Sequence, residues 1–416
     1  MIPALSERTR RWLVGLLAVL AIVWAGSAIW SLWAEISWQK AHNLDFLPLW
    51  LGGRALLHRM DPTDPEVLAR LFSVSDVRMR CIGFHTYYPQ SAALVFLPLG
   101  AVPFWALDGW LQAAFGLALV AGMALPAGST SRGARAMASM ALATGIVASL
   151  RMTPLVVGMG QSNAILVLLA GLGVWALARD RTAWGGAAIG LGIAIKLFPL
   201  VLLVPAMLGR RWRLVGIAVA VPLLALGISL GFYAGPWAGS PLGAGAAAFV
   251  GEAMHPAWAE QERSFVLALW STRLWLPGLL AVGLTAWAAR RPDPAVIPAL
   301  AALWIAWVGT AMAGTSMPHQ AILILPAVGW LLAWPTPGRR IWPALAAGVL
   351  VAAVANWRHV LTEHWPRTLQ WLPVCWAVVL GCSVRVVDLL LPPGWAAGRA
   401  AAGSDPSATT PRPRPG

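Results

Sequence analysis

Asp45, near the start of the chain, is a carboxylate in apolar surroundings. It precedes the string Phe46-Leu47-Pro48-Leu49-Trp50. Burial in such a setting disfavours the charged form of a carboxyl group unless a basic partner compensates, and this suits a general base. The structural alternative is that Asp45 caps a short interfacial helix or pairs with Arg54.

A lysine lies in the middle of one of the most apolar parts of the chain. Lys196 begins the string Lys196-Leu197-Phe198-Pro199. A lysine that faces lipid costs roughly 2.5 to 3.5 kcal/mol on insertion scales, so Lys196 must face a partner or a water-filled site. There it could bind a phosphate, or it could pair with a carbonyl or carboxylate group of another helix.

Two groups of polar residues could contact a substrate. In the segment 160–163, the amides of Gln161 and Asn163 could bind sugar hydroxyls, or the segment could simply cap the helix that follows. His85 and Tyr88 belong to an aromatic and proline cluster. This cluster could form a platform for a lipid or a sugar, or it could pack a loop onto the membrane; His85 is its titratable member.

The composition predicts which kind of secondary structure positions these residues. The chain is 59% hydrophobic and 11% charged over 416 residues, which indicates an all-α polytopic membrane protein. The net charge of +14 would favour nucleic-acid binding in a soluble domain, but the arginines lie in groups between apolar runs, where they act as topology signals. Nucleic acid is therefore not an expected partner. About 11 to 12 membrane helices are expected, at roughly 12–33, 104–126, 136–150, 162–178, 183–195, 197–209, 214–233, 272–289, 295–314, 320–334, 341–357 and 369–391.

The arginine groups also predict an orientation. They fall on one side of the membrane if both termini are cytoplasmic, which places the protein in the plasma (inner) membrane as a multi-pass protein. The segment 34–103 is then an extracytoplasmic loop with interfacial helices. The pair 183–195 and 197–209 has basic clusters at both ends, so it is expected to be broken or re-entrant, with Lys196 at its tip. Residues 1–395 form one transmembrane domain, and 396–416 a disordered cytoplasmic tail.

The order of several motifs resembles glycosyltransferase family 87. The residues that carry the resemblance are Asp45-Phe46 to Trp50, Gly53-Arg54-Ala55-Leu56-Leu57 with Asp61-Pro62, Tyr88-Pro89, Phe96-Leu97-Pro98-Leu99, Gly160-Gln161-Ser162-Asn163, Lys196-Leu197-Phe198-Pro199 and Arg210-Arg211-Trp212-Arg213. The resemblance implies a GT-C fold, an active site on the extracytoplasmic face and a sugar donor carried on a polyprenyl phosphate. It is strongest over residues 43 to 213.

Roles for individual residues follow from the resemblance together with their chemistry. Asp45 is the expected catalytic base. The expected ligands of the donor phosphate are Lys196, His319 and Arg263, and the expected substrate-binding residues are Arg54, His85, Tyr88, Gln161 and Asn163. No cofactor or metal is expected, and the partners are membrane lipids, the polyprenyl-phosphate-linked sugar donor and a glycolipid or glycan acceptor.

The chain departs from the family pattern at three places. Tyr88-Pro89-Gln90 stands where Tyr-Pro-Pro is common, Glu262-Arg263-Ser264 where an Asn-Gln-Ser type element is common, and His319 is a single histidine where a pair is common. These departures bear on which acceptor is used more than on which type of reaction is catalysed.

One carboxylate is enough for the expected reaction. A glycosidase needs an acid to protonate a poor leaving group, whereas a lipid phosphate already leaves readily. Direct displacement inverts the anomeric centre, and mannose is the expected sugar. Two other classes compete with this interpretation: a transporter or flippase of a lipid-linked sugar, which needs no base, and a catalytically inactive lipid-binding subunit of an envelope-synthesis complex.

Overall fold

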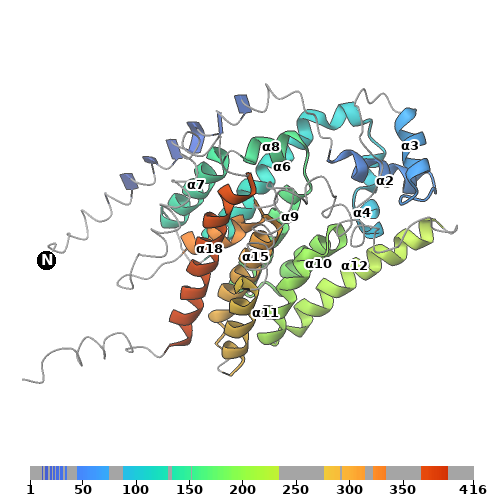
Figure 1. Ribbon diagram of the computed structural model, residues 1–416. Helices are drawn as coiled ribbons and strands as arrows, with labels where there is room; N and C mark the ends of the chain where they lie inside the picture. Colours follow the sequence, from blue (N-terminus) through green and yellow to red (C-terminus); the bar gives the residue numbers. More distant parts are fainter. Residues whose placement is uncertain are drawn as a thin grey trace, which may run out of the picture.

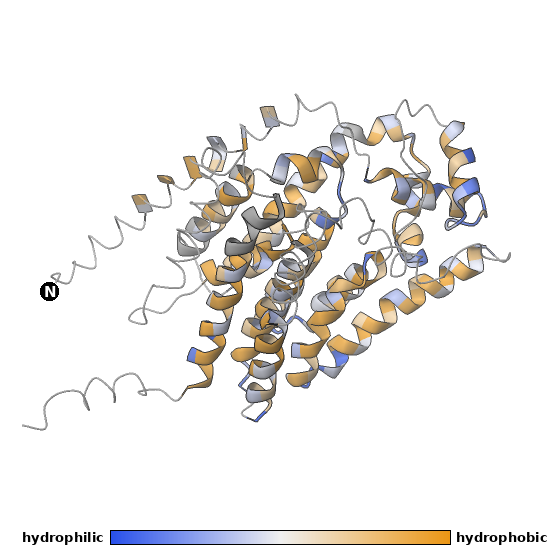
Figure 2. Ribbon diagram, in the orientation of Figure 1, coloured by the Kyte–Doolittle hydropathy of each residue, from blue (hydrophilic) through white to orange (hydrophobic). Residues whose placement is uncertain are grey.

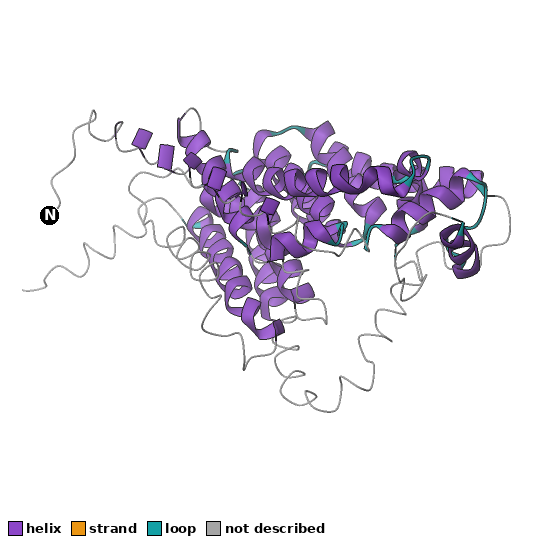
Figure 3. Cartoon of the chain, turned by 90° about the horizontal axis from the view of Figure 1, so that it is seen from above, coloured by secondary structure: helices purple, strands orange, loops and turns teal. Residues whose placement is uncertain are grey.

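In the part of the chain that the computed structural model describes, helices are joined by turns and short loops, and no strand occurs there (Figures 1 and 3). The described residues are parts of 12–34, then 45–74, 88–129, 134–150, 152–233, 276–290, 293–313, 322–333 and 367–391. The principal helices are α2 (Leu47–Leu57), α3 (Pro65–Ser73), α4 (Gln90–Val95), α5 (Leu97–Gly100), α6 (Phe104–Ala127), α7 (Ala134–Ser149), α8 (Met152–Gly158), α9 (Asn163–Arg179), α10 (Thr182–Ile195), η1 (Phe198–Leu202), α11 (Leu203–Leu208), α12 (Trp212–Phe232), α15 (Val296–Ala313), α16 (Leu325–Leu332) and α18 (Arg367–Leu390).

The long helices pack as a bundle that joins elements both near and far apart in the sequence. Helix α6 packs on α9, α9 on α10, and α10 on α12, while α15 packs on α18 and α16 on α6. Glycines allow several of these close approaches. A Cβ atom on Gly186 would lie 2.9 Å from the carbonyl oxygen of Leu214, and one on Gly190 would lie 2.9 Å from that of Ala218. Small residues of this kind are typical of helix contacts in membranes, where close backbone packing replaces the hydrophobic driving force.

Among the residues that the structure describes, two helices are long and apolar enough to cross a membrane, over Gly109–Ala127 and Trp212–Phe232. Several shorter apolar helices accompany them, including Asn163–Arg179 and Thr182–Ile195. The prediction of 11 to 12 membrane helices is thus not confirmed in number. Helix α12 is apolar over most of its length, yet only 22% of its apolar stretch is buried (Figure 2). An apolar helix with so much uncovered surface is suited to contact with lipid.

The break predicted at Lys196 is present. Helix α10 ends at Ile195, and Lys196 has extended backbone angles (φ −151°, ψ 142°) before η1 begins at Phe198. A Cβ on Gly192 would lie 3.0 Å from the Pro199 ring, so the chain folds back against α10 after the break. At the other end, Arg211 Nη1 lies 2.9 Å from Asp180 Oδ1, and this ion pair joins the residues that precede α10 and α12. The two ends of the broken unit therefore meet, as the basic clusters predicted.

Arg179 marks the same end of the bundle. Its Nε donates a hydrogen bond to the carbonyl oxygen of Ser129 (2.6 Å) and its Nη2 to that of Gly128 (3.3 Å), just beyond the end of α6. Basic side chains are favourable there because the last carbonyls of a helix carry partial negative charge. The C-termini of α6 and α9 and the start of α10 thus share a basic end. The segment around Lys196 lies at the opposite end of α10.

The segment predicted as a loop with interfacial helices, 34–103, contains α2 to α5. Helix α2 is deeply buried in the bundle. Trp50 is 1% exposed, its Nε1 donates to the carbonyl oxygen of Val102 (3.0 Å), and its ring meets that of Phe104 at 5.3 Å. A turn at Asp61 to Pro65 leads into α3: Asp61 accepts hydrogen bonds from Thr63, and Asp64 caps α3 by accepting from the Glu66 amide (2.8 Å).

Candidate active site

Asp45 is held in place by its own backbone and by the residue that follows it. Its amide donates to the carbonyl oxygen of Met159 (2.9 Å). The next residue, Phe46, is fully buried, and its ring contacts Phe96 (5.3 Å) and Phe115 (5.8 Å) edge to face. These aromatic contacts hold the start of α2 in place. The Asp45 carboxylate, one residue before Phe46, is half-buried.

The turn before α9 presents three buried polar side chains. Gly160 has a positive φ of 65°, a conformation that glycine adopts without strain, and the Gln161 amide then closes the turn by donating to the carbonyl oxygen of Val156 (2.9 Å). Helix α9 begins at Asn163. Gln161, Ser162 and Asn163 are all 5% exposed or less. Polar groups buried to this extent need partners, and they find them on other segments.

Two amides bridge Lys196 to Asp45. Lys196 Nζ donates to Asn163 Oδ1 (3.1 Å), Asn163 Nδ2 donates to Gln161 Oε1 (3.1 Å), and Gln161 Nε2 donates to Asp45 Oδ2. In each of these three hydrogen bonds the donor lies on the Lys196 side and the acceptor on the Asp45 side. Rotating either amide by 180° would oppose donor to donor or acceptor to acceptor, so the charges at the two ends define the amide orientations.

Tyr88 packs against this hydrogen-bonded series of side chains. Its hydroxyl lies 3.1 Å from Ser162 Oγ, and Lys196 Nζ lies 5.4 Å from the centre of its ring, in cation–π geometry. Burial raises the pKa of Tyr88 to about 12, so the phenol stays protonated and neutral. Helix α4, which follows Tyr88, is tied to the end of α10 because Ser91 Oγ donates to the carbonyl oxygen of Ala194 (2.7 Å).

The two charged groups that the amides connect, Asp45 and Lys196, have hydrogen-bonding capacity that no described residue uses. Desolvation raises the pKa of Asp45 above its ordinary value of 3.8, while the Gln161 hydrogen bond and the charge of Lys196 oppose that shift. Among the described residues, none donates to Asp45 Oδ1, and Asn163 accepts only one of the three ammonium protons of Lys196. Asp45 and Lys196 are half-buried, whereas the two amides between them are covered. The arrangement can accept a proton at one end and bind an anion at the other.

Comparison with protein families identifies the chain. The sequence model of glycosyltransferase family 87 matches residues 84–315, more than half of the chain. The chain belongs to glycosyltransferase family 87. The comparison with curated proteins gave no match, and neither did the comparison with solved structures. The family 87 match includes Tyr88, Gln161, Asn163 and Lys196 but begins after Asp45, so the geometry alone joins Asp45 to the matched region.

The structure brings together five of the residues predicted for a family 87 site: Asp45, Tyr88, Gln161, Asn163 and Lys196. Neither structural alternative for Asp45 is realised, since Phe46 is the residue before α2 and makes no side-chain cap, and Asp45 bonds to Gln161 instead of Arg54. Ser162 likewise makes no side-chain cap on α9. The structural alternative for Lys196, a pair with a carbonyl group of another helix, is present, because Lys196 Nζ donates to the side-chain carbonyl oxygen of Asn163.

Arg54 has different partners. Its Nη1 donates to the carbonyl oxygen of Gly100 (3.3 Å), and its guanidinium lies 5.1 Å from the centre of the Trp50 ring, so its contacts tie α2 to α5. His85, Arg263 and His319 lie outside the described residues, and their predicted roles stay predictions. The sequence analysis assigned no role to Ser91 and only a helix cap to Ser162; their position beside the predicted residues is the signal that was available.

Proposed function

We propose that this glycosyltransferase moves a sugar, mannose in the first instance, from a polyprenyl-phosphate donor to a lipid-linked or glycan acceptor. The observation that carries the proposal is the hydrogen-bonded chain from Lys196 to Asp45. It holds a candidate base and a candidate phosphate ligand at one end of an apolar bundle. A carrier of lipid-linked sugars needs the cation but has no use for the base.

The proposed reaction is a single displacement at the anomeric carbon. The acceptor hydroxyl oxygen forms a bond to that carbon as the bond from carbon to phosphate oxygen breaks, and the electron pair of the broken bond stays on the phosphate. Asp45 takes the hydroxyl proton, and the Lys196 ammonium stabilises the negative charge that develops on the leaving phosphate. The configuration of the sugar is inverted.

Transfer of radiolabelled sugar by the purified protein tests the proposal directly. A panel of polyprenyl-phosphate donors is offered with lipid extracts as acceptors. Label in a glycolipid or glycan product that depends on one donor supports the proposal. Movement of an intact lipid-linked sugar across proteoliposomes without any product would favour a flippase.

The proposal includes a GT-C arrangement with the site on the extracytoplasmic face and both termini in the cytoplasm. The basic end of the bundle, with Arg179 and the Asp180–Arg211 ion pair, lies at the opposite end of α10 from Lys196. Because basic residues favour the cytoplasmic side, this polarity supports an outward-facing site.

Cysteine labelling in intact cells checks the orientation. In a parent whose three native cysteines are replaced by alanine, Glu66→Cys, on exposed α3, should react with a membrane-impermeant maleimide. Ala295→Cys, in the exposed turn before α15, should react only after permeabilisation. The reverse pattern would contradict both the orientation and the outward-facing site.

A pH profile checks the role of Gln161. Asp45 must be deprotonated to act as a base, so transfer falls as the pH drops through the Asp45 pKa, which lies above 3.8 because of burial. Gln161→Met removes the hydrogen bond that lowers this pKa. We therefore expect the acid limb of the kcat/KM profile to move to higher pH. Tyr88→Phe keeps the Asp45–Gln161 bond and should leave the limb in place; a limb that does not move in Gln161→Met would show that Asp45 is not the group being titrated.

A further inference from the structure

The turn between α9 and α10 and the turn between α11 and α12 have the same backbone structure. In each, an amide donates to the carbonyl oxygen five residues earlier, from Arg181 in the first turn (2.9 Å) and from Arg211 in the second (3.0 Å). The residue before each donor, Asp180 or Arg210, has a φ of 54°. The ion pair between Asp180 and Arg211 joins the two turns. Residues 179–184 and 209–213 thus form one surface, the double turn.

The double turn is strongly basic, since it contains five arginines and one aspartate. Two of the arginines are used within the protein: Arg179 donates to carbonyl oxygens beyond α6, and Arg211 pairs with Asp180. The three other arginines are exposed: Arg181, Arg210 and Arg213. No residue in the described part of the chain hydrogen-bonds to their guanidinium groups or pairs with them. These three charges can therefore contact an anionic partner.

Arg210 occupies a position that would suit glycine better. Its φ of 54° lies in the left-handed region, where a Cβ atom is crowded by the backbone. The chain has a glycine one residue earlier, Gly209, whose φ is an ordinary −74°. An arginine at position 210 brings no advantage to the backbone, so its exposed charge is the property that accounts for it.

Exposed aromatic and aliphatic side chains adjoin the arginines. Trp184 is 65% exposed in the first turn of α10, and Trp212 is 62% exposed at the start of α12. Further along α12, four more large apolar side chains are exposed: Val219, Leu223, Leu224 and Ile228. Along α12, arginine and tryptophan are thus followed by apolar surface. Headgroups, the interface and hydrocarbon follow one another in the same order in a membrane leaflet.

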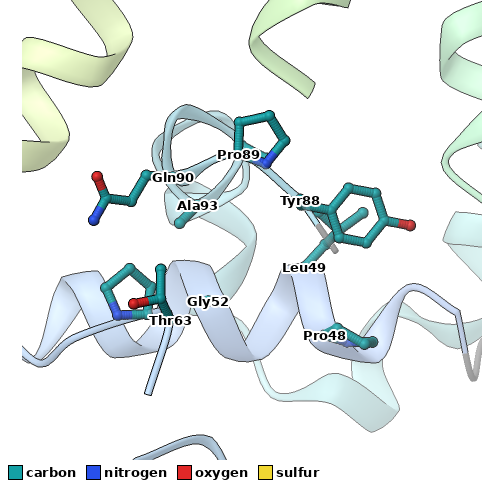
Figure 4. A pocket seen from close by; sticks show the side chains of 10 residues that line it. Pro48, Leu49, Gly52, Thr63, Tyr88, Pro89, Gln90 and Ala93 are labelled. Atoms are coloured by element: carbon teal, nitrogen blue, oxygen red, sulfur yellow. The ribbon is translucent and has the colours of Figure 1, made fainter. Parts of the chain in front are cut away.

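The length of α12 matches the thickness of a membrane. Its 21 residues span about 30 Å at 1.5 Å per residue, which is also the thickness of the hydrocarbon core. Near its far end, Ser229 Oγ donates to the carbonyl oxygen of Gln90 (3.4 Å), which Figure 4 shows at the start of α4. The double turn therefore lies about one hydrocarbon thickness away from α4.

We propose that the double turn binds the headgroups of anionic phospholipids. Guanidinium groups match the geometry of a lipid phosphate, and the tryptophans suit the level of the headgroups. The acyl chains then lie along the uncovered surface of α12. An acidic protein or a nucleic acid would complement the arginines, but it would leave the adjoining apolar surface in water. The proposal does not depend on sugar transfer.

Two substitutions with the same chemistry separate lipid binding from folding. Arg210→Gly removes one charge and introduces the residue that the left-handed backbone favours, so it should not lower stability. Arg59→Gly is the matched control, because Arg59 is also exposed and has a φ of 56°. Arg59 follows α2, which packs on α4, away from the double turn (Figure 4). A triple variant adds Arg181→Gln and Arg213→Gln to Arg210→Gly.

The experiment titrates the purified full chain in dodecyl maltoside micelles with phosphatidylglycerol or phosphatidylcholine and records the melting temperature. We expect phosphatidylglycerol to stabilise the parent more than phosphatidylcholine does. Each arginine near an anionic lipid surface should contribute about fivefold in affinity. Arg210→Gly should therefore need about five times more phosphatidylglycerol for half of the effect, and the triple variant about a hundred times more. Arg59→Gly should respond like the parent.

Several results would overturn the proposal. One is equal stabilisation of the parent by the two lipids, and another is a triple variant that responds to phosphatidylglycerol like the parent. A loss in Arg59→Gly as large as that in Arg210→Gly would show that the effect is not local to the double turn. Inorganic phosphate and polyglutamate are tested without added lipid. If either stabilises the parent as much as phosphatidylglycerol does, the surface binds a free anion or an acidic protein and not a lipid.

Discussion

Asp45→Asn is expected to lower the rate of sugar transfer by about 10² to 10⁴, the usual effect of removing a general base. The amide has nearly the same shape as the carboxylate, and its oxygen can still accept the hydrogen bond from Gln161 Nε2. It cannot take the proton of the acceptor hydroxyl. Donor binding should therefore persist while the chemical step is lost. Single-turnover transfer from radiolabelled donor, measured beside donor binding, separates the two effects.

Asp64→Asn is a matched control for this substitution. Asp64 caps α3 through a hydrogen bond from the Glu66 amide, and asparagine caps helices about as well as aspartate. This variant should therefore keep both its stability and its transfer rate. A folded Asp45→Asn protein that transfers sugar at a rate close to that of the parent would exclude Asp45 as the base.

Lys196→Met is expected to weaken binding of the polyprenyl-phosphate donor by about 30-fold to a few thousand-fold. This range corresponds to the roughly 2 to 5 kcal/mol that is lost when one partner of a buried charge pair is truncated. Methionine retains the apolar stem that packs near Tyr88 and removes only the charge. Equilibrium binding of the donor to purified protein measures the effect, and the melting temperature shows whether the fold has suffered.

Arg213→Met provides the comparison for charge loss elsewhere. Arg213 is exposed near the start of α12, at the basic end of the bundle. Its replacement removes the same charge and should leave donor affinity unchanged. If Lys196→Met also binds the donor as tightly as the parent, Lys196 serves only to join α10 to α9 through Asn163. The phosphate ligand must then be sought at Arg263, His319 or His85.

Hydropathy and local breakers determined where the helices lie. The run predicted at 104–126 is α6, Phe104–Ala127, and the run at 162–178 is α9, Asn163–Arg179. The break at Lys196 was also predictable, because basic clusters flank the unit and Pro199 follows in the next element. These features depend on residues that are close in sequence: apolar runs favour helices, and charges and prolines end them. The family was recognisable for a similar reason, since its motifs are short strings in a fixed order.

Side-chain partners were decided by tertiary structure. The sequence named Asp45, Gln161, Asn163 and Lys196, but it could not show that two amides link the carboxylate to the ammonium, because these contacts join three separate segments. Which hydrogen bond a buried polar group makes depends on which segments meet and at what depth, and a hydropathy pattern carries no such information.

Arg54 and Gln90 are two residues whose tertiary contacts could not be predicted from the sequence. Arg54 was expected at the substrate, and the structure shows that it also ties α2 to α5 through Gly100 and Trp50. Gln90 was only a departure from a family motif, and the structure buries its side-chain amide without a hydrogen bond to any described residue. The sequence by itself determined the helical class, the family and most of the residues that could do chemistry. The tertiary structure alone decided which of them meet, since that choice is made by packing between helices far apart in the chain.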